Sequence, residues 1–216
     1  HRRAGQRPAD HQRRPVKVAL VDSGGTNIAS VSFALERLGV PSTLTADAAT
    51  IQAADRVILP GVGAAGAGMR RLHDADLVTV LRDVERPLLG VCLGMQLLFD
   101  GSEEDGGVPC LGLIAGTVAA MEPGAGVRIP HMGWNTLSVI RPDPLIRGLS
   151  DGDRAYFVHS YAAPVGEHTL VTTWHGQDYS AVVRSGNRWG AQFHPERSAA
   201  VGAAILANFV AEDPDE

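Results

Sequence analysis

Apolar residues in the first half of the chain alternate between two spacings. Short, mostly apolar runs occur at 16–22, 55–60 and 87–91, the first of them rich in β-branched residues, and such runs are typical of strands buried on both faces of a sheet. Each run precedes a segment with apolar residues at helical spacing, at 28–39, 69–84 and 93–100. This order predicts strands that alternate with helices, and therefore a parallel sheet covered on both faces.

The pattern changes after about residue 108. Short β-rich stretches separated by Gly, Pro, Asn and Asp lie at 116–121, 135–140, 155–162, 169–175, 179–185 and 189–193. We expect antiparallel strands and hairpins that extend the first sheet. An amphipathic segment at 198–210 predicts a final helix. Because no linker, repeat or change of composition marks a second domain, residues 16–212 are predicted to form one domain.

Residues 1–15 are basic, poor in apolar residues and without periodicity. This composition predicts a disordered extension, or a remnant of the expression vector, outside the domain.

Composition narrows the class of protein. The 216 residues are 44% hydrophobic and 20% charged, with a formal net charge of −5 and a pI near 5.9. This profile is typical of a globular protein in solution and offers no basic surface for nucleic acid. No apolar stretch reaches the roughly 20 residues that span a bilayer, and no apolar signal-peptide core is visible. We therefore expect a cytoplasmic protein with neither nucleic acid nor membrane as a partner.

One of the two cysteines, Cys92, lies in the segment GVCLG at 90–94, where a predicted strand meets a predicted helix. Flanking glycines permit a sharp turn that exposes the central side chain at the carboxyl end of a sheet, as in the nucleophile elbow of hydrolases. A helix N-terminus also favours the thiolate. The alternative is a buried cysteine that packs as a small hydrophobic residue, which is also our interpretation of Cys110.

His194 and Glu196 follow the last predicted strand, in GAQFHPE at 190–196. Residues two apart in an extended segment point to the same side. The carboxylate can therefore orient the imidazole, whose second nitrogen is then free to take a thiol proton. The alternative is a turn with solvated side chains. His131 lacks such a carboxylate two residues on.

Three segments in this order and spacing, PGVG at 60–63, GVCLGMQ at 90–96 and GAQFHPE at 190–196, resemble the class I glutamine amidotransferases. PHMGWN at 130–135 and YFVHSY at 156–161 are similar to one branch, the glutaminase subunits of imidazole glycerol phosphate synthases. The resemblance covers residues 16–210. It implies the α/β amidotransferase fold, with a central, mostly parallel open sheet flanked by helices and an antiparallel, β-rich C-terminal half.

The resemblance implies that Cys92, His194 and Glu196 form a catalytic triad. Glutamine would be hydrolysed to glutamate and ammonia through a thioester on Cys92, with His194 moving the protons in both half-reactions. No cofactor is implied. No set of His, Cys and carboxylate residues has metal-ligand spacing, so we expect no metal.

The same resemblance assigns the groups around the substrate. A backbone N–H near Val62 or Gly63 would join that of Leu93 in stabilising the oxyanion, although PGVG by itself is more typical of an ordinary strand-ending turn. Gln96, one helical turn beyond the nucleophile, matches a glutamine ligand of the family. The remaining implied contacts to glutamine are at Glu104, Ser160 and Tyr161.

A partner is implied as well. In the branch named above, the partner is a (β/α)₈-barrel cyclase that forms a heterodimer with the glutaminase and receives ammonia through an internal passage. Trp134 and Asn135 are then candidate interface residues, because aromatic residues are enriched at interface hot spots. The alternative for Trp134 is a core position. Arg197, where the family often has lysine, is a third interface candidate.

Other functions remain open at this point. The glycine-rich SGGTN at 23–27 resembles a phosphate-binding turn, but it lacks the Walker lysine and the full GxGxxG spacing. A non-catalytic regulatory subunit would have lost a triad residue, and none is lost. Amidotransferases that serve guanylate, anthranilate or carbamoyl phosphate synthesis share the triad, and only the segments at 130–135 and 156–161 speak against them.

Overall fold

The computed structural model describes residues 14–25 and 28–211 of the chain. The predicted extension at 1–15 therefore lies outside the described residues, except for Arg14 and Pro15. The end of the glycine-rich segment, Thr26 and Asn27, also lies outside them. In the described part, no helix is long and apolar enough to cross a bilayer.

An eight-stranded sheet forms the centre of the molecule, in the order β2-β1-β3-β4-β14-β13-β12-β9. The neighbours from β2 to β14 pair in parallel, and those from β14 to β9 pair antiparallel. The predicted fold class, a parallel sheet continued by an antiparallel C-terminal half, is confirmed. The strand bounds are β1 Val18–Val21, β2 Ser42–Thr45, β3 Arg56–Gly61, β4 Leu88–Cys92, β9 Ser138–Val139, β12 Thr169–Trp174, β13 Asp178–Ser185 and β14 Arg188–Ala191.

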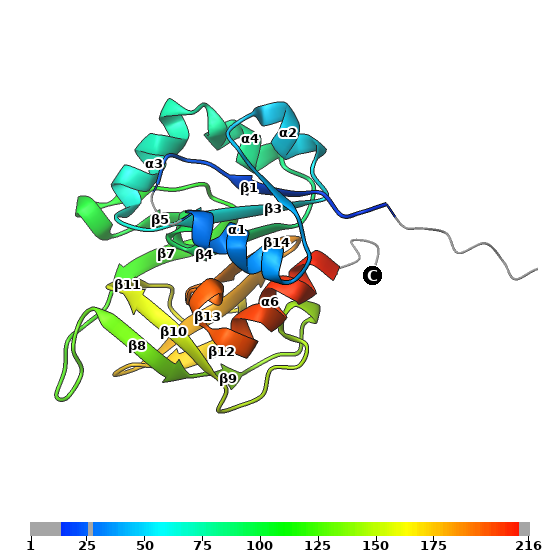
Figure 1. The fold of residues 1–216 in the computed structure, drawn as a ribbon. Coiled ribbons are helices and arrows are strands. Elements are labelled where there is room, and N and C mark those ends of the chain that lie inside the picture. The colour runs from blue at the N-terminus through cyan, green and yellow to red at the C-terminus, as the bar shows by residue number, and fades with distance from the viewer. Residues whose placement is uncertain (1–13, 26–27, 212–216) are drawn as a thin grey trace, which may run out of the picture.

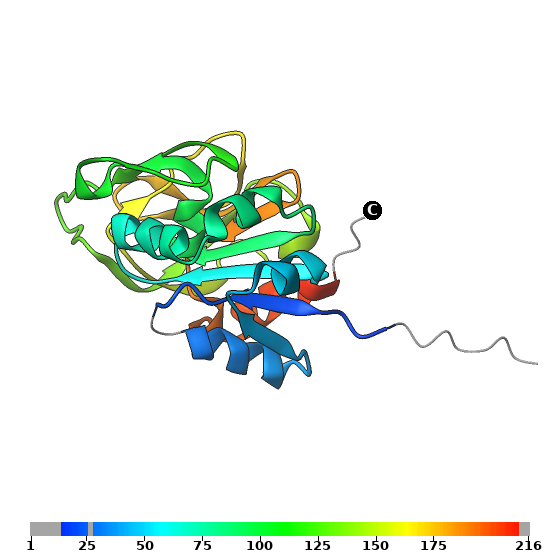
Figure 2. The same cartoon turned by 90° about the horizontal axis from the view of Figure 1, so that it is seen from above.

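Helices cover both faces of this sheet, as Figure 1 and Figure 2 show. One face carries α1 (Ile28–Arg37) and α6 (Ala199–Ala211), and the other carries α2 (Ala48–Ala53), α3 (Ala65–Asp74), α4 (Leu77–Asp83) and α5 (Leu93–Leu97). Side chains of β1 alternate between two buried cores, one on each face. The parallel strands are continuous apolar runs in the sequence because neither face of the sheet is exposed to water.

Two predicted helices differ from the structure. The helical segment at 69–84 is two helices, because Asp76 adopts a left-handed φ of 56° between them. The segment at 93–100 is helical only to Leu97, after which β5 (Phe99–Ser102) begins. Strand β2 and helix α2 were not predicted from the sequence. The residues of β2 are exposed or half-buried at the sheet edge, so this strand has no continuous apolar run.

The β-rich half does not all extend the central sheet, contrary to expectation. Strands β8 (His131–Thr136) and β10 (Arg154–His159) form a separate antiparallel pair. A four-stranded sheet has the order β11-β7-β5-β6, with β6 Val108–Pro109, β7 Ile114–Ala120 and β11 Tyr161–Ala162. Burial alternates along β10, as expected for a strand with only one face on the core. Short 3₁₀ turns lie at Glu104–Gly106, Pro144–Ile146 and Pro195–Arg197.

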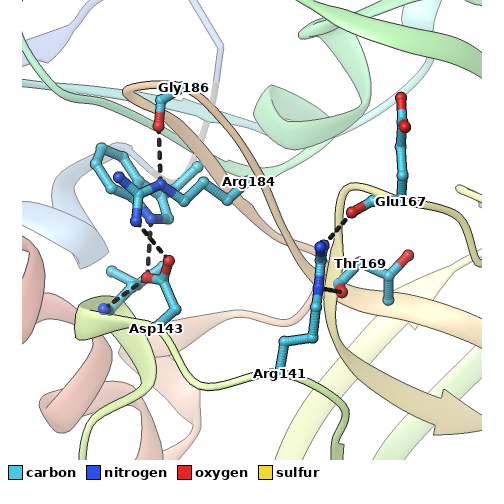
Figure 3. A network of polar contacts seen from close by, with 8 residues as sticks. Arg141, Asp143, Glu167, Thr169, Arg184 and Gly186 are labelled. Carbon is cyan, nitrogen blue, oxygen red and sulfur yellow. Dashed lines mark hydrogen bonds and ion pairs between the residues drawn. The ribbon is translucent and has the colours of Figure 1, made fainter.

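A polar cluster fixes the loop after β9 to the antiparallel strands (Figure 3). The Asp143 carboxylate accepts from Arg184 at 2.7 Å and from the Trp189 indole at 3.1 Å. It also accepts from the Leu145 backbone N–H at 2.9 Å. The Asp143 side chain is only 4% exposed, and three donors offset the cost of burying its charge. Nearby, Arg141 donates to the Thr169 carbonyl at 3.1 Å.

Candidate active site

The carboxyl ends of β3, β4 and β14 lie side by side because these three strands are parallel neighbours in the sheet. Gly61 pairs with Cys92, and Val91 pairs with Ala191. The segments that follow the strands therefore meet at one edge: 62–63 after β3, α5 after β4, and 192–196 after β14. Ligands of open α/β sheets bind at this edge.

Cys92 lies at a strained turn between β4 and α5, with φ 54° and ψ −113°. The glycines around it are required by close packing. A Cβ on Gly90 would lie 2.5 Å from the Gly94 carbonyl oxygen, and a Cβ on Gly94 would lie 1.8 Å from the carbonyl oxygen of Leu59. The predicted sharp strand-to-helix turn is therefore confirmed, and backbone strain at one residue is a feature of functional sites.

A cavity of about 390 Å³ opens beside this turn. All seven residues predicted to contact the substrate or its oxyanion line it, together with Cys92 and His194. The lining residues are Val62, Gly63, Cys92, Leu93, Gln96, Glu104, Pro130, Val158, His159, Ser160, Tyr161 and His194. A larger groove of about 630 Å³ lies among β1, β2 and α2. Its lining contains no histidine or cysteine, so the smaller cavity is the candidate site.

The imidazole of His194 is held between the cavity and a buried carboxylate. Its Nδ1 lies 2.8 Å from Oε1 of Glu196, and the two side chains are 4% and 3% exposed. The Ser198 hydroxyl donates to the His194 carbonyl at 2.7 Å and fixes the backbone of this turn. Nε2 of His194 is buried and has no hydrogen-bond partner among the described residues. Orientation by the carboxylate leaves this nitrogen to act as a base.

The comparisons with known proteins agree on one family. The family model for glutamine amidotransferase class-I matches residues 19–212. The imidazole glycerol phosphate synthase subunit HisH of Xanthomonas axonopodis pv. citri is 58% identical over 89% of this chain and 96% of its own. The subunit of the same name from Xylella fastidiosa (strain Temecula1 / ATCC 700964) is 51% identical over 91% of this chain and 98% of its own. The chain belongs to the class-I glutamine amidotransferase family, in its HisH branch.

Solved structures share the amidotransferase fold at low sequence identity. A crystal structure of glutamine amidotransferase has a TM-score of 0.69 at 20% identity, covering 90% of this chain and 97% of that one. The structure of PurLQS from Thermotoga maritima has a TM-score of 0.67 at 19% identity, covering 92% of this chain and 99% of that one. At such identities the likeness concerns the fold alone.

Charges around His194 favour its protonated form in this member of the HisH branch. Burial lowers the pKa of His194, but the neighbouring Cys92 and Glu196 side chains outweigh burial and raise that pKa to about 10. The Cys92 thiol donates to the Val158 carbonyl at 3.9 Å, and Gln192 Nε2 donates to Sγ at 3.8 Å. The arrangement favours an imidazolium at His194, beside the Cys92 sulfur.

Gln192 is a buried polar residue to which the sequence analysis gave no role. Its amide oxygen accepts from Gln96 Nε2 at 2.9 Å, and its amide nitrogen donates to the Cys92 sulfur at 3.8 Å. It is fully buried. A polar residue in an otherwise apolar strand end was the available signal, because a buried amide needs hydrogen-bond partners. Gln192 links the nucleophile to the predicted glutamine ligand.

The residues predicted to contact glutamine have different hydrogen-bond partners around the cavity. Glu104 Oε2 accepts from the Ala65 backbone N–H at 2.8 Å, at the start of α3. Burial raises the pKa of the Glu104 carboxyl. The Tyr161 carbonyl accepts from Gln96 at 2.9 Å and is also 2.8 Å from His159 Nδ1. Both its lone pairs are thus in use, which leaves the Ser160–Tyr161 segment to contact a substrate through other atoms.

The candidate interface residues lie outside the cavity, with different exposures. Trp134 is 46% exposed, which argues against a core position. Its ring lies edge-on to Tyr156, whose other contact is the Arg197 guanidinium at 4.0 Å from the ring centre. Asn135 is half-buried and donates to His131 Nε2 at 3.0 Å. In the described part of the chain, no group of three or more His, Cys, Asp and Glu residues could hold a metal ion.

The histidines of this site predict how stability changes with pH. Burial lowers the pKa of His131 to about 3 and that of His159 to about 4. Below the unfolded pKa of 6.5, the unfolded chain binds protons that the folded chain does not. Stability should therefore fall on acidification, by about 1.4 kcal/mol per pH unit for each histidine. Urea unfolding at pH 7, 6 and 5 measures this fall.

His194 acts in the opposite direction and in another pH range. Its pKa is raised in the folded protein, so its contribution is complete below pH 6.5 and is lost as the pH rises towards about 10. The two effects therefore do not overlap. An unfolding free energy that stays constant between pH 7 and pH 5 would contradict neutral, buried His131 and His159.

Proposed function

We propose that this chain is the glutaminase subunit of an imidazole glycerol phosphate synthase. It hydrolyses glutamine to glutamate and ammonia and supplies the ammonia to a cyclase subunit in histidine biosynthesis. The cyclase, a (β/α)₈ barrel in a heterodimer, uses the ammonia to make imidazole glycerol phosphate and an aminoimidazole carboxamide ribonucleotide. The observation that carries the proposal is a cysteine at a strained elbow beside an oriented histidine. The names of relatives more than 50% identical support this assignment.

In the first half-reaction, Cys92 Sγ attacks the side-chain amide carbon of glutamine. The C–N bond then breaks, and the proton carried by His194 Nε2 goes to the leaving nitrogen, so that ammonia departs and a γ-glutamyl thioester remains. Nε2 suits this role because it is buried without another partner. Glu196 holds Nδ1 and stabilises the imidazolium.

In the second half-reaction, water replaces ammonia. His194 Nε2 takes a proton from the water as its oxygen attacks the thioester carbon, and the C–S bond breaks to release glutamate and the Cys92 thiolate. Backbone N–H groups of Leu93 and of Val62 or Gly63 stabilise the oxyanion in both steps. All three residues line the cavity beside Cys92, which supports this assignment.

Gln96 and Glu104 are proposed to bind the amino-acid end of glutamine. Both nitrogen-bound hydrogens of Gln96 are used within the protein, on Tyr161 and Gln192. Its amide oxygen is then the atom left for the substrate, and it can accept from the α-ammonium or the amide. The Glu104 carboxylate adds a charge of the sign that an α-ammonium requires.

The proposed docking surface for the cyclase consists of Met132, Trp134, Tyr156 and Arg197. Met132 and Trp134 are 63% and 46% exposed and project from β8. Exposed aromatic, Met and Arg side chains are typical of interface cores. Asn135 on the same strand, a candidate from the sequence, would contribute from a half-buried position. A cytoplasmic location stays a prediction.

The experiment that tests this function compares glutamine hydrolysis by the chain alone and with a cyclase subunit and its nucleotide ligand. We expect slow release of glutamate from the chain alone and a rate at least about tenfold higher in the complex, because free ammonia would otherwise be wasted. A glutaminase rate that is high without a partner and unchanged by the cyclase would argue against a synthase subunit. No hydrolysis under either condition would refute the glutaminase itself.

Glu196→Gln tests the orienting carboxylate. The amide can still contact Nδ1 at a similar distance, but it removes the negative charge that stabilises the imidazolium. We expect glutamine turnover in the complex to fall by about 10²-fold or more. Cys92 should still react with an electrophilic glutamine analogue. Unchanged turnover would remove Glu196 from the triad.

A further inference from the structure

A directed chain of hydrogen bonds runs from strand β8 to the cavity. The Tyr161 carbonyl can only accept, so His159 Nδ1 carries a hydrogen and donates to it at 2.8 Å. In the neutral ring, His159 Nε2 is then an acceptor, and His131 Nδ1 must donate to it at 2.9 Å. The remaining His131 nitrogen, Nε2, accepts from the Asn135 amide at 3.0 Å, and the same amide nitrogen donates to the Trp174 carbonyl at 2.8 Å.

Each histidine is therefore restricted to one tautomer, with the hydrogen on Nδ1. The two residues lie directly opposite each other in the β8–β10 pair. Their exposed fractions are 3% for His131 and 7% for His159. The His131 ring is stacked between Phe157 and His175, with centroid distances of 4.6 Å and 4.2 Å. Packing on both faces leaves this ring little freedom to rotate.

A proton on His159 Nε2 would face the His131 Nδ1–H, and a proton on His131 Nε2 would face the N–H of the Asn135 amide. Burial, the largest cause, and neighbouring histidines lower the pKa of His131. Burial is also the largest cause of the lowered pKa of His159. The neighbouring His175 also lowers the pKa of both rings, and His194 lowers that of His159. Both rings are neutral at pH 7.

The chain ends on an atom that also determines the geometry of the cavity. The Tyr161 carbonyl oxygen accepts from Gln96 Nε2 at 2.9 Å, on the other side from His159. Gln96 Nε2 in turn donates to Gln192 Oε1 at 2.9 Å. These two bonds fix which way the Gln96 amide faces. Loss of the bond from His159 would free the Tyr161 peptide to move and would leave one of its lone pairs unsatisfied.

We propose that His131 and His159 are positioning residues for glutamine binding: their neutral imidazoles hold the Tyr161 carbonyl, and through it the Gln96 amide, in the orientation that receives the substrate. The proposal rests on the glutaminase function proposed above. Neither histidine touches the reacting atoms in it. Their effect is on the affinity for glutamine, whereas Cys92, His194 and Glu196 determine the rate of the chemical steps.

The first test is nuclear magnetic resonance of the ¹⁵N-labelled full chain at pH 7, with ring signals assigned by single histidine substitutions. We expect His131 and His159 to be neutral with the hydrogen on Nδ1, whereas free histidine favours Nε2. A hydrogen on Nε2 of either ring, or a charged ring, would overturn the chain of hydrogen bonds. This result does not depend on whether the protein hydrolyses glutamine.

The second test uses two substitutions of His159 that each keep one of its nitrogen positions. His159→Asn places an amide near Nδ1 and can still donate to Tyr161, whereas His159→Gln places its amide near Nε2 and cannot. For glutaminase in the complex, we expect KM for glutamine to rise about tenfold in His159→Gln, with kcat changed less than about threefold. His159→Asn should recover most of the wild-type KM.

The outcomes separate the two proposals. Equal KM values for the Asn and Gln variants, or a change confined to kcat, would overturn the positioning role. The alkylation rate of Cys92 in the absence of glutamine should be the same in both variants, and a lower rate would indicate damage to the nucleophile instead. If the wild-type complex does not hydrolyse glutamine, the proposed function fails, and the tautomer measurement alone decides the hydrogen-bond chain.

Discussion

Cys92→Ala is expected to abolish glutamate release, with or without the cyclase, by a factor of at least about 10⁴. The substitution removes the atom that forms the thioester, and His194 alone can only direct water at an unactivated amide. Alanine is smaller than cysteine and keeps the elbow, although the left-handed φ of 54° stays unfavourable for any residue with a Cβ. The measurement is release of glutamate from glutamine by the purified complex.

Cys110→Ala is the matched control. Cys110 is also buried, but it lies outside the cavity, and burial raises the pKa of its thiol to about 11. It should therefore resist alkylation at neutral pH, and its replacement should leave glutaminase activity close to that of the wild type. Turnover by Cys92→Ala above about a hundredth of the wild-type rate would contradict the thioester mechanism. Loss of activity in Cys110→Ala but not in Cys92→Ala would also contradict the thioester mechanism.

Most of the central sheet follows from apolar runs that can be recognised in the sequence. The apolar runs that form β1, β3 and β4 are continuous because helices cover both faces, and the glycines around Cys92 indicate a sharp turn. The order of the strands could not be predicted in this way, because β14 pairs with β4 across about a hundred positions of the sequence. Local patterns carry no information on that pairing. The residues of the triad could be proposed from spacing and resemblance, whereas the distances between them could not be predicted.

The polar interior around the cavity could not be predicted for the same reason. His159 lies in a predicted strand, whereas the segment around His131 was not predicted as one, and only the register of β8 against β10 brings the two residues face to face. Gln192, directly after β14, contacts Gln96 on helix α5. Single buried polar residues are visible in a sequence, whereas their partners are not. Such residues therefore indicate where a site lies, but they do not indicate which residues hydrogen-bond to one another in it.

Gly202→Ala is expected to damage the active site from helix α6. A Cβ on Gly202 would lie 1.7 Å from the Pro195 carbonyl oxygen, closer than real Cβ atoms come to any atom. Pro195 lies between His194 and Glu196, so the helix and the triad must move apart. We expect a loss of about 1–3 kcal/mol in the free energy of unfolding. Glutaminase activity should fall by about 10²-fold, because small displacements of catalytic groups cost this much.

The sequence contains a signal for this contact. Glycine inside a helix costs about 1 kcal/mol relative to alanine, so its presence within the predicted helix at 198–210 indicates a packing reason. Gly124→Ala is the control, because a Cβ there meets nothing within 4 Å and no positive φ is required. Urea unfolding and glutaminase assays of both variants test the prediction. If Gly202→Ala is as active as Gly124→Ala, the position of Glu196 does not depend on the packing of α6.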